Sequence, residues 1–496
     1  MKIVLVHVKE NFTPVPPTGL LYVGTMLKKD GHQVRVYDVN IKQKRRVIRK
    51  IAEFDPDLVG FSAMTTSYSI TCQFNREVRK SVPRAYYCWG GVHASALPEE
   101  TMRDNELDFV VYGEGELTLS EICSRIKPRT RGGRGINLKG VRGVYYYLDG
   151  RVFRNESRPL IQELDSIPIP DRSLIDDFKW YLSPPGILRG KFYYGITTMY
   201  TTRGCPYQCI FCASKIVHGS MIRRRSVDNV LEEMKYLKRE FGVRGIYFND
   251  DTFATDVDWL KEFCSRLKKS GLSMVWGCQT RANIAQNIEI LRIIKDAGCV
   301  QVDIGCESGS DKVLKNLKKG ITAEMILKSF DNLRKVGMVT FATFILGNPG
   351  ETLEDIRKTE AVAKKAPGGV SFLILVPYPG SPLYKMAIDN KWFVGDNIQF
   401  DERWTNKQSD VPVMAAGLRP DELVRIRAKL QNQFFIRNNV ETVLAFAKSP
   451  YFLMQAAMTI VRHPVFVAKS ARGALRKGKA MDFLEDMYQK FNEDLR

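Results

Sequence analysis

The first 125 residues alternate between short runs of β-branched or aromatic residues and longer stretches with apolar positions at helical spacing. Such runs are typical of strands, and helices between them indicate parallel strands joined by crossovers. The fold class expected for residues 1–126 is therefore α/β, with a five-stranded parallel sheet. The predicted strands are Ile3 to Val8, Gln33 to Tyr37, Leu58 to Ser62, Ala85 to Trp89 and Phe109 to Tyr112.

A second alternating pattern begins near residue 197 and contains six strand-helix units. It predicts a partial (β/α)6 barrel over residues 191–400, whose ligand site lies at the carboxyl ends of the strands. The predicted strands are Thr197 to Thr201, Gly245 to Phe248, Met274 to Cys278, Val300 to Ile304, Thr340 to Leu346 and Val370 to Val376.

Two segments fall outside these patterns. Residues 127–190 contain a Gly/Arg-rich stretch, a hairpin with a turn at Asp149-Gly150 and a proline-rich run, which together predict a linker. Residues 401–496 show helical periodicity without strand signals, and they predict a helical, basic C-terminal region.

Small and polar residues follow every predicted strand of the first domain. Ligands of open parallel sheets sit beyond the carboxyl ends of the strands, so these residues are candidates for ligand contact. Glycine at such a place either admits a bulky ligand or serves a tight turn, and the loops alone leave both explanations open. The candidates are Thr18, Gly19, Ser62, Met64, Thr65, Gly90, Gly91, His93, Gly113 and Glu114.

The predicted barrel has an equivalent set at the ends of its second to sixth strands. Taken singly, Asp250 and Asp251 also fit the N-cap of the next helix, and Glu307 fits a surface carboxylate. Their joint occurrence at successive strand ends favours a binding site. The set is Asp250, Asp251, Gln279, Arg281, Gly305, Glu307, Ser308, Gly347, Pro377 and Tyr378.

The composition fits a large soluble enzyme. The chain has 496 residues, of which 44% are hydrophobic, and ten cysteines that form no disulfide-like pattern, which favours a reducing cytoplasm. Met1 to Val8 is expected to be a strand and not a signal peptide, and no apolar run reaches the ~18 residues of a spanning helix. The net charge of +20 indicates an acidic or phosphorylated partner, or a basic solvated surface.

Three cysteines with the spacing Cys205-x3-Cys209-x2-Cys212 carry the most specific signal. Such a loop can bring three thiolates to one side of an iron-sulfur cluster and leave one iron open to another ligand. A zinc site would need a fourth ligand, for which His218 is the nearby candidate. Ordinary buried cysteines are a further alternative.

This cysteine motif, with Phe211 before its last cysteine, resembles that of the radical S-adenosylmethionine (SAM) superfamily. The resemblance implies a [4Fe-4S] cluster whose open iron binds the amino and carboxylate groups of SAM. Reduction by a donor such as flavodoxin or ferredoxin then cleaves SAM to a 5′-deoxyadenosyl radical, which removes a hydrogen atom from an unactivated carbon. No side chain is predicted to be a catalytic residue.

The resemblance extends over about Met199 to Tyr384 and implies SAM contacts at the strand ends named above. Acids after the second strand can accept hydrogen bonds from the methionine ammonium, and Arg281 can pair with the carboxylate. Glu307 can bind the ribose hydroxyls, and the loops of the fifth and sixth strands can receive adenine.

The first domain is similar to the Rossmann-like cobalamin-binding domain that precedes the barrel in one radical SAM subgroup. Ser62-x-Met64 and Gly90-Gly91 stand where that fold contacts the nucleotide tail of cobalamin. The loop that carries a histidine ligand to cobalt in methionine-synthase-like relatives reads Lys9 to Pro14 here and has no histidine. The resemblance therefore implies cobalamin without a lower histidine ligand, or a domain that has lost it. His93 is expected to be a turn residue or a ligand contact.

The C-terminal region contains no acid between Glu441 and Asp482 but seven Lys or Arg residues, interleaved with apolar ones. Such a segment can lie at a membrane interface, with its cations on anionic headgroups, or pack against the barrel. The basic residues lie among aliphatic side chains, which disfavours nucleic acid as a partner. They are Lys448, Arg462, Lys469, Arg472, Arg476, Lys477 and Lys479.

These observations together predict a cytoplasmic radical SAM enzyme, membrane-associated through its C-terminal region, that methylates an unactivated carbon. The expected substrate is a hydrophobic small molecule of lipid or isoprenoid type. A radical SAM cyclase or C–C coupling enzyme, a tRNA-modifying enzyme and a non-enzymatic cobalamin or Fe-S sensor are the alternatives. Cys72, Cys88 and Cys123 are too dispersed for the second cysteine triad expected of a methylthiotransferase.

Overall fold

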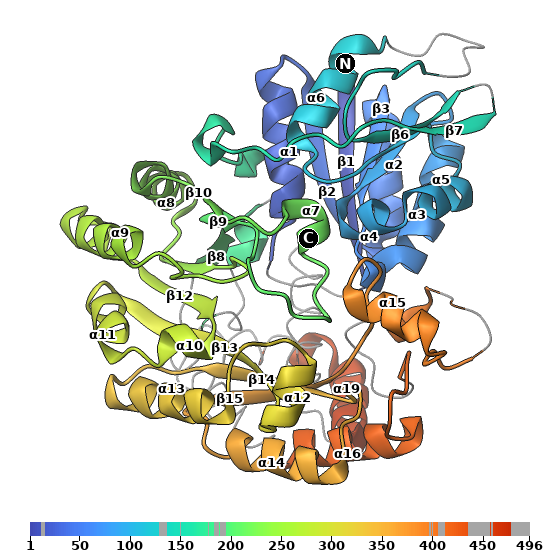
Figure 1. The fold of residues 1–496 in the computed structure, drawn as a ribbon. Coiled ribbons are helices and arrows are strands. Elements are labelled where there is room, and N and C mark those ends of the chain that lie inside the picture. The colour runs from blue at the N-terminus through green and yellow to red at the C-terminus, as the bar shows by residue number, and fades with distance from the viewer. Residues whose placement is uncertain are drawn as a thin grey trace.

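The structure is a computed structural model. It describes residues 1–10, 15–127, 136–148, 150–176, 178–182, 195–395, 400–404, 412–434 and 460–477, and residues 188, 398 and 457. Two large sheets with helices packed against them dominate this part of the chain, the amino-terminal sheet in the upper half of Figure 1 and the second large sheet in the lower half, and a two-stranded sheet accompanies them.

The first sheet has the strand order β2-β1-β3-β4-β5-β6-β7, and β1 to β5 are parallel as predicted. Its central strands are buried on both faces: Ile3 and Leu5 face one hydrophobic core, and Val4 and Val6 face another. This two-sided burial explains the continuous apolar runs of the sequence. The parallel strands are β1 (Lys2–Lys9), β2 (Gln33–Asn40), β3 (Leu58–Ser62), β4 (Tyr86–Gly90) and β5 (Phe109–Val111).

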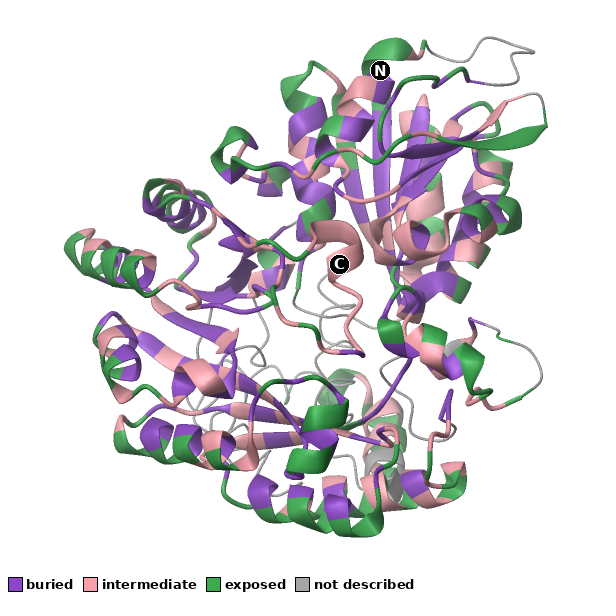
Figure 2. Ribbon diagram, viewed as in Figure 1, coloured by how far each residue is buried: buried purple, intermediate pink, exposed green. Residues whose placement is uncertain are grey.

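Helices cover both faces of this sheet (Figure 1). They are α1 (Thr18–Lys29), α2 (Lys44–Phe54), α3 (Tyr68–Ser81), α4 (Gly91–Ala96), α5 (Pro98–Asn105) and α6 (Glu116–Arg125). Purple strands lie between helices whose outer faces are green in Figure 2, so the polar positions of the helical periodicity are the exposed ones.

The predicted hairpin is part of the first sheet. Strand β6 (Val144–Leu148) pairs antiparallel with β5, and β7 (Arg151–Arg154) pairs with β6. Without β6, the hydrogen-bonding edge of β5 would be open, and the buried Val144 and Tyr146 would lose their packing. The sheet therefore has two more strands than the sequence predicted. Asp149 of the predicted turn lies outside the described residues.

The second sheet consists of six parallel strands in the order β15-β14-β13-β12-β11-β8, which confirms the predicted partial barrel. The neighbours in space are neighbours in sequence, as short right-handed crossovers require. The strands are β8 (Ile196–Met199), β11 (Gly245–Phe248), β12 (Val275–Thr280), β13 (Cys299–Glu307), β14 (Phe341–Leu346) and β15 (Gly369–Ile374).

Helices pack on the outer face of these strands, where Phe248, Phe263 and Trp276 form part of an aromatic core. They are α8 (Val227–Phe241), α9 (Val257–Lys269), α10 (Ala282–Ala285), α11 (Ile288–Asp296), α12 (Asp311–Asn316), α13 (Ala323–Lys335) and α14 (Leu353–Ala363). Helix α15 (Pro382–Asp389) packs instead with α12 and the segment around Ile210. After β8 come β9 (Thr202–Arg203), the short helix α7 (Lys215–His218) and β10 (Arg223–Arg224), and β9 and β10 pair antiparallel.

The C-terminal region contains α16 (Pro420–Gln433), which packs on β15 through the buried Leu423 and Leu430. Helix α19 (Pro464–Lys477) carries part of the predicted basic segment, whereas Lys448 and Lys479 lie outside the described residues. Within the described ranges, no helix is both long and apolar enough to cross a lipid bilayer.

Candidate functional site

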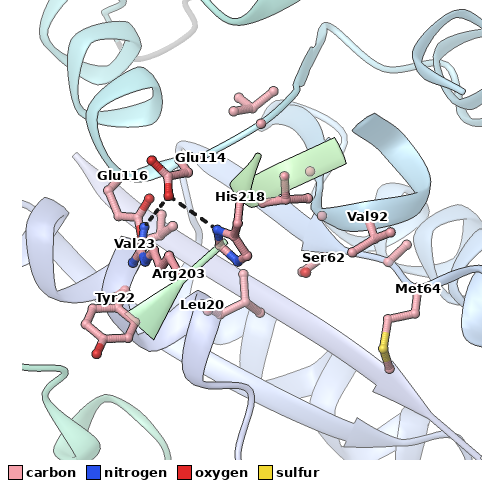
Figure 3. A pocket seen from close by; sticks show the side chains of 18 of the residues that line it. Leu20, Tyr22, Val23, Ser62, Met64, Val92, Glu114, Glu116, Arg203 and His218 are labelled. Atoms are coloured by element: carbon pink, nitrogen blue, oxygen red, sulfur yellow. Dashed lines mark hydrogen bonds and ion pairs between the residues drawn. The ribbon is translucent and has the colours of Figure 1, made fainter. Parts of the chain in front are cut away.

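A cavity of about 440 Å³ lies between the two sheets. The carboxyl ends of β3 and β4 and the start of α1 border it from the first domain, and residues after β8 and β11 and at the end of β12 border it from the second. Figure 3 shows side chains of the first domain and of the β9–α7 segment around this space. The ligand-binding edges of both sheets thus face the same cavity.

Seven of the residues predicted to contact cobalamin border this cavity: Gly19, Ser62, Met64, Gly90, Gly91, Gly113 and Glu114. A Cβ atom added at Gly19 or Gly113 would meet no atom within 4 Å, so these glycines leave room in the cavity. A Cβ atom at Gly91, whose φ is +89°, would lie 2.9 Å from the Ser62 Oγ. Glycine therefore provides ligand space at two positions and close loop contact at a third.

Thr18, Thr65 and His93 do not border the cavity. His93 is buried against Tyr68, with ring centroids 4.0 Å apart, and its Nδ1 lies 3.1 Å from the Thr65 hydroxyl. Burial lowers the pKa of His93 to about 3, so its imidazole is neutral. The Thr18 hydroxyl donates to the Pro16 carbonyl. In the structure, these three residues organise the loops behind the cavity.

Of the predicted SAM residues, Asp251 and Gln279 border the cavity, together with Asn249, which sequence analysis did not select. Asp250 points elsewhere: it is fully buried and accepts hydrogen bonds from the backbone N–H groups of Thr201 and Thr202. Burial raises the pKa of Asp250 to about 6 in spite of these donors.

Asp250 therefore fixes the turn after β8 instead of facing the cavity. The N-cap of α9 is Asp256, so neither Asp250 nor Asp251 serves as that cap.

The remaining predicted SAM residues lie beside the second sheet but do not border the cavity. Glu307 pairs with the buried Lys319 at 2.6 Å, and the Ser308 hydroxyl lies 3.0 Å from that of Thr359. The Gly347 N–H donates to Glu351. Gly305 lies beside this ion pair, since an added Cβ would be 2.6 Å from the Glu307 Oε1, and Pro377 and Tyr378 follow β15.

The three motif cysteines lie between β9 and α7 on a loop fixed by backbone contacts. The Ile210 N–H donates to the Leu317 carbonyl at 3.1 Å, and the Ile210 carbonyl accepts from the Leu383 N–H at 2.8 Å. Cys205, Cys209 and Cys212 are free thiols of intermediate exposure. Their side chains are therefore available as ligands, and the loop is held in place without them.

No group of three or more Cys, His, Asp or Glu side chains in the described part of the chain is arranged around a single metal ion. A cubane cluster binds each thiolate to a different iron, so its cysteines do not need to converge on one point. His218, the candidate fourth zinc ligand, has its Nδ1 3.3 Å from the Glu114 Oε1.

Arg281 contacts the cysteine loop and not the cavity. Its guanidinium lies 3.6 Å from the Tyr207 ring centroid, and its Nη1 is 3.6 Å from the Cys209 Sγ. Its Nη2 donates to the Lys319 carbonyl. Arg281 supports the loop in this arrangement, and its contact with the SAM carboxylate stays a prediction.

A buried ion-pair network joins the two domains at the cavity wall. Glu114 accepts hydrogen bonds from Arg223 at 2.9 Å and Arg203 at 3.2 Å, and it also contacts His218 (Figure 3). Arg203 donates in addition to Glu116 at 2.6 Å. The basic partners belong to the second domain and the acids to the first, so the network fixes how the domains face each other.

The partners of Glu114 lower the pKa of its carboxyl group. Burial opposes ionisation of this carboxyl, but His218, Arg203, the Ile161 N–H and Arg223 outweigh it and lower the pKa to about 2. Sequence analysis did not select Arg203, which lies two residues before Cys205, or Arg223, the first of three consecutive arginines, since neither position indicates which acid it will contact. Only the fold brings them to Glu114.

Comparison with protein families agrees with both halves of this arrangement. The B12 binding domain model matches residues 2–123, and the Radical SAM superfamily model matches residues 199–363. An uncharacterised methyltransferase of Pyrococcus horikoshii is 32% identical over 461 residues, which cover 91% of this chain and 94% of the relative. The chain belongs to the radical SAM superfamily. Within it, the chain is of the type with an amino-terminal B12-binding domain.

Two further similarities extend along most of this radical SAM protein. Cytidylyl-2-hydroxyethylphosphonate methyltransferase of Streptomyces wedmorensis is 28% identical over 85% of this chain and 86% of its own. The solved structure of the cobalamin-dependent SAM radical enzyme OxsB has a TM-score of 0.69 at 18% identity, and covers 100% of this chain and 79% of its own. The likeness to OxsB concerns the fold.

The cofactors of this enzyme are a [4Fe-4S] cluster, SAM and cobalamin, and the residues present fit them. Three free thiols lie on one loop, the polar Asn249, Asp251 and Gln279 border the cavity, and the glycines of the first domain leave space opposite. The absence of a histidine in residues 9–14 agrees with cobalamin held without a lower histidine ligand.

Replacing Glu114 with Gln is expected to lower the free energy of unfolding by about 3 kcal/mol, because it leaves the buried Arg223 without a carboxylate partner and Arg203 with Glu116 alone. The pKa of Glu114 falls from 4.5 to about 2 on folding, so its stabilisation is complete above pH 4.5 and is lost as the pH falls toward 2. The variant should therefore show a weaker pH dependence in that range, measured by denaturant unfolding.

Glu121→Gln is the matched control, because Glu121 pairs with Arg158 and is partly exposed. Its cost should stay below about 1 kcal/mol. Equal stability losses in the two variants would contradict the role assigned to the network.

Proposed function

We propose that this enzyme transfers a methyl group to an unactivated carbon of a hydrophobic, lipid- or isoprenoid-like small molecule. The observation that carries the proposal is the single cavity bordered by strand ends of both domains. A methyl donor on the first domain and a radical source on the second would then reach the same substrate carbon. The relatives from Pyrococcus horikoshii and Streptomyces wedmorensis, both named as methyltransferases, support methyl transfer. Cyclases are also among the similar proteins, so a radical SAM cyclase is the alternative.

Different residues of the chain would bind the cluster and SAM. Cys205, Cys209 and Cys212 would hold the cluster, and Asp251 would accept hydrogen bonds from the ammonium group of SAM. Gln279 donates to the Asp250 carbonyl, which fixes its amide beside the cavity. When bound, the cluster and SAM supply a carbon radical and cobalamin supplies a methyl group.

The cavity wall suits this chemistry because apolar side chains exclude water from it. Leu20, Val23 and Val217 line it between the two polar edges. A dry wall protects a reactive radical from side reactions and strengthens the polar contacts that orient SAM.

The substrate class is supported by α19 and the residues just before it. Val461 is 79% exposed and Val465 is 81% exposed, and the exposed Lys469 and Arg472 follow on the same segment without an acid. Such a surface suits an anionic membrane interface that delivers a lipid substrate. The segment's other predicted residues between 435 and 456 lie outside the described residues.

A phosphorylated small molecule is the second candidate substrate. The net charge of +20 favours an anionic ligand, and the relative from Streptomyces wedmorensis is named for a cytidylyl phosphonate. To test both classes, the reconstituted enzyme is incubated with methyl-deuterated SAM and either an isoprenoid lipid extract or a nucleotide-linked metabolite pool. A deuterated methyl group in a lipid supports the proposal, and one confined to the nucleotide pool replaces it with the second candidate.

Cys209→Ala is expected to lose most of the cluster iron and to abolish formation of 5′-deoxyadenosine, because one thiolate ligand is missing. Iron analysis and the visible absorption of anaerobically reconstituted protein measure this loss. Cys264→Ala is the control, since Cys264 is buried in α9 away from the loop, and it should keep iron and SAM cleavage. Zinc in place of iron in the parent protein would overturn the cluster assignment.

Gly19→Phe is expected to reduce cobalamin occupancy at least tenfold while iron content stays unchanged. An added side chain at Gly19 enters open space at the cavity and fills part of the volume that the cofactor needs. Cofactor extraction and visible spectra after cobalamin-replete expression measure the occupancy. Gly19→Ala controls for the helix position and should bind cobalamin normally; full occupancy in the Phe variant would place cobalamin elsewhere.

Val461→Glu with Val465→Glu is expected to weaken binding to vesicles of anionic phospholipid several-fold, because it puts acids on the exposed apolar surface. Flotation of full-length protein measures this binding. Leu353→Glu is the control, because Leu353 is an exposed apolar residue on α14. If the double variant and the parent bind vesicles equally, α19 is not a membrane contact.

A further inference from the structure

Arg281 is a buried cation, 6% exposed, and among the described residues no carboxylate forms an ion pair with it. Its Nε lies 3.3 Å from the Asn283 Oδ1, and its Nη2 donates to the Lys319 carbonyl, so both of these acceptors are neutral. The nearby Glu307 pairs with the Lys319 ammonium at 2.6 Å instead. A buried charge is costly unless an anion compensates it, so this guanidinium indicates an anionic partner.

The guanidinium of Arg281 is held with one N–H group toward a motif cysteine. Its Nη1 lies 3.6 Å from the Cys209 Sγ, a separation that suits an N–H donor and a sulfur acceptor. The guanidinium also lies 3.6 Å from the centroid of the Tyr207 ring, and the Tyr207 hydroxyl accepts from the Asn283 Nδ2 at 3.3 Å. The ring and the carbonyl of Lys319 therefore fix the direction of the Nη1 donor, and the anion beside it would be the Cys209 thiolate.

A second motif cysteine also has a polar neighbour, but this neighbour is uncharged. The Cys212 Sγ lies 3.3 Å from the Ser214 Oγ. A thiolate has no proton to donate, so the Ser214 hydroxyl would donate to Cys212 in the cluster-bound form. The contact of Arg281 with Cys209 differs from this one because it adds a full positive charge to the hydrogen bond.

We propose that Arg281 raises the reduction potential of the cluster, because it places a fixed positive charge and an N–H donor on the Cys209 thiolate. This inference rests on the proposed function, in which Cys205, Cys209 and Cys212 hold that cluster. In the step concerned, one electron leaves a low-potential donor, which is oxidised, and enters the cluster, which is reduced. No proton moves, and no bond is made or broken.

The physical reason is the charge that reduction adds. The electron enters a cluster whose thiolate ligands are already negative, so a fixed cation stabilises the reduced form more than the oxidised form. Net charge, hydrogen bonds to sulfur and solvent exposure are the factors that set the potentials of iron-sulfur clusters. Arg281 is buried, so water screens its charge little. It acts on the cluster through Cys209 and is therefore a positioning residue.

Arg281→Gln is expected to shift the midpoint potential of the cluster to more negative values. At the midpoint potential of the parent protein, the ratio of reduced to oxidised cluster should fall at least tenfold, which is about 59 mV for a one-electron couple. The reconstituted full-length holoenzyme is poised at a series of potentials with dithionite and mediators, before SAM is added. Low-temperature EPR measures the reduced cluster, and iron analysis of the same samples separates a shift from a loss of cluster.

Two controls separate the charge of Arg281 from other effects of the substitution. Arg292→Gln removes the same charge from an exposed side chain of α11 that pairs with Glu289, where water screens it. Asn283→Ala removes the contacts with Tyr207 and with the Arg281 Nε but keeps the cation. Both controls should keep the midpoint potential of the parent. No shift in Arg281→Gln, or an equal shift in Arg292→Gln, would overturn the proposal.

Asn283→Asp provides the same comparison if Arg281→Gln does not hold a cluster. It places a carboxylate at the position 3.3 Å from the Arg281 Nε, so it neutralises the cation in place and should also lower the potential. An unchanged potential together with weaker SAM binding in Arg281→Gln would overturn the proposal and assign Arg281 to the SAM carboxylate. The potentials are measured without methyl transfer, so failure of the proposed methylation would leave them unaffected.

Discussion

The burial of Glu114 between the two domains is the constraint on which the site depends. A carboxylate at this depth is stable only with cationic partners, and Arg203 and Arg223 both come from the second domain, as does the hydrogen-bonding His218. Any rotation of one domain against the other would leave charges buried without partners. The domains are therefore held in the one arrangement in which their ligand-binding edges share a cavity.

A similar division between support and function recurs around the cavity. Asp250 closes the turn after β8, and the adjacent Asp251 faces the cavity. Arg281 braces the loop next to Cys209, and Gln279, two residues earlier, borders the cavity. Of two neighbouring polar residues at a strand end, one thus supports the backbone and the other borders the cavity. The chain turns there, so successive side chains point in different directions.

The cysteine loop lies between the segment that borders the cavity and helices α12 and α15. Backbone hydrogen bonds at Ile210 hold it to the segments around α12 and α15, so its position does not depend on a bound cluster.

The sequence by itself determined the two alternating α/β patterns, the cysteine triad and the loops that face the cavity. Period, turn residues and ligand spacing are local properties that a single segment carries. Only the tertiary structure decided which of these loop residues border the cavity. His93 and Asp250 do not border it, whereas Asn249, which the sequence did not indicate, does. It also placed the hairpin β6–β7 in the first sheet and Arg203 and Arg223 on Glu114. These contacts join residues far apart in the chain, and their energies depend on burial and charge pairing that no local pattern contains.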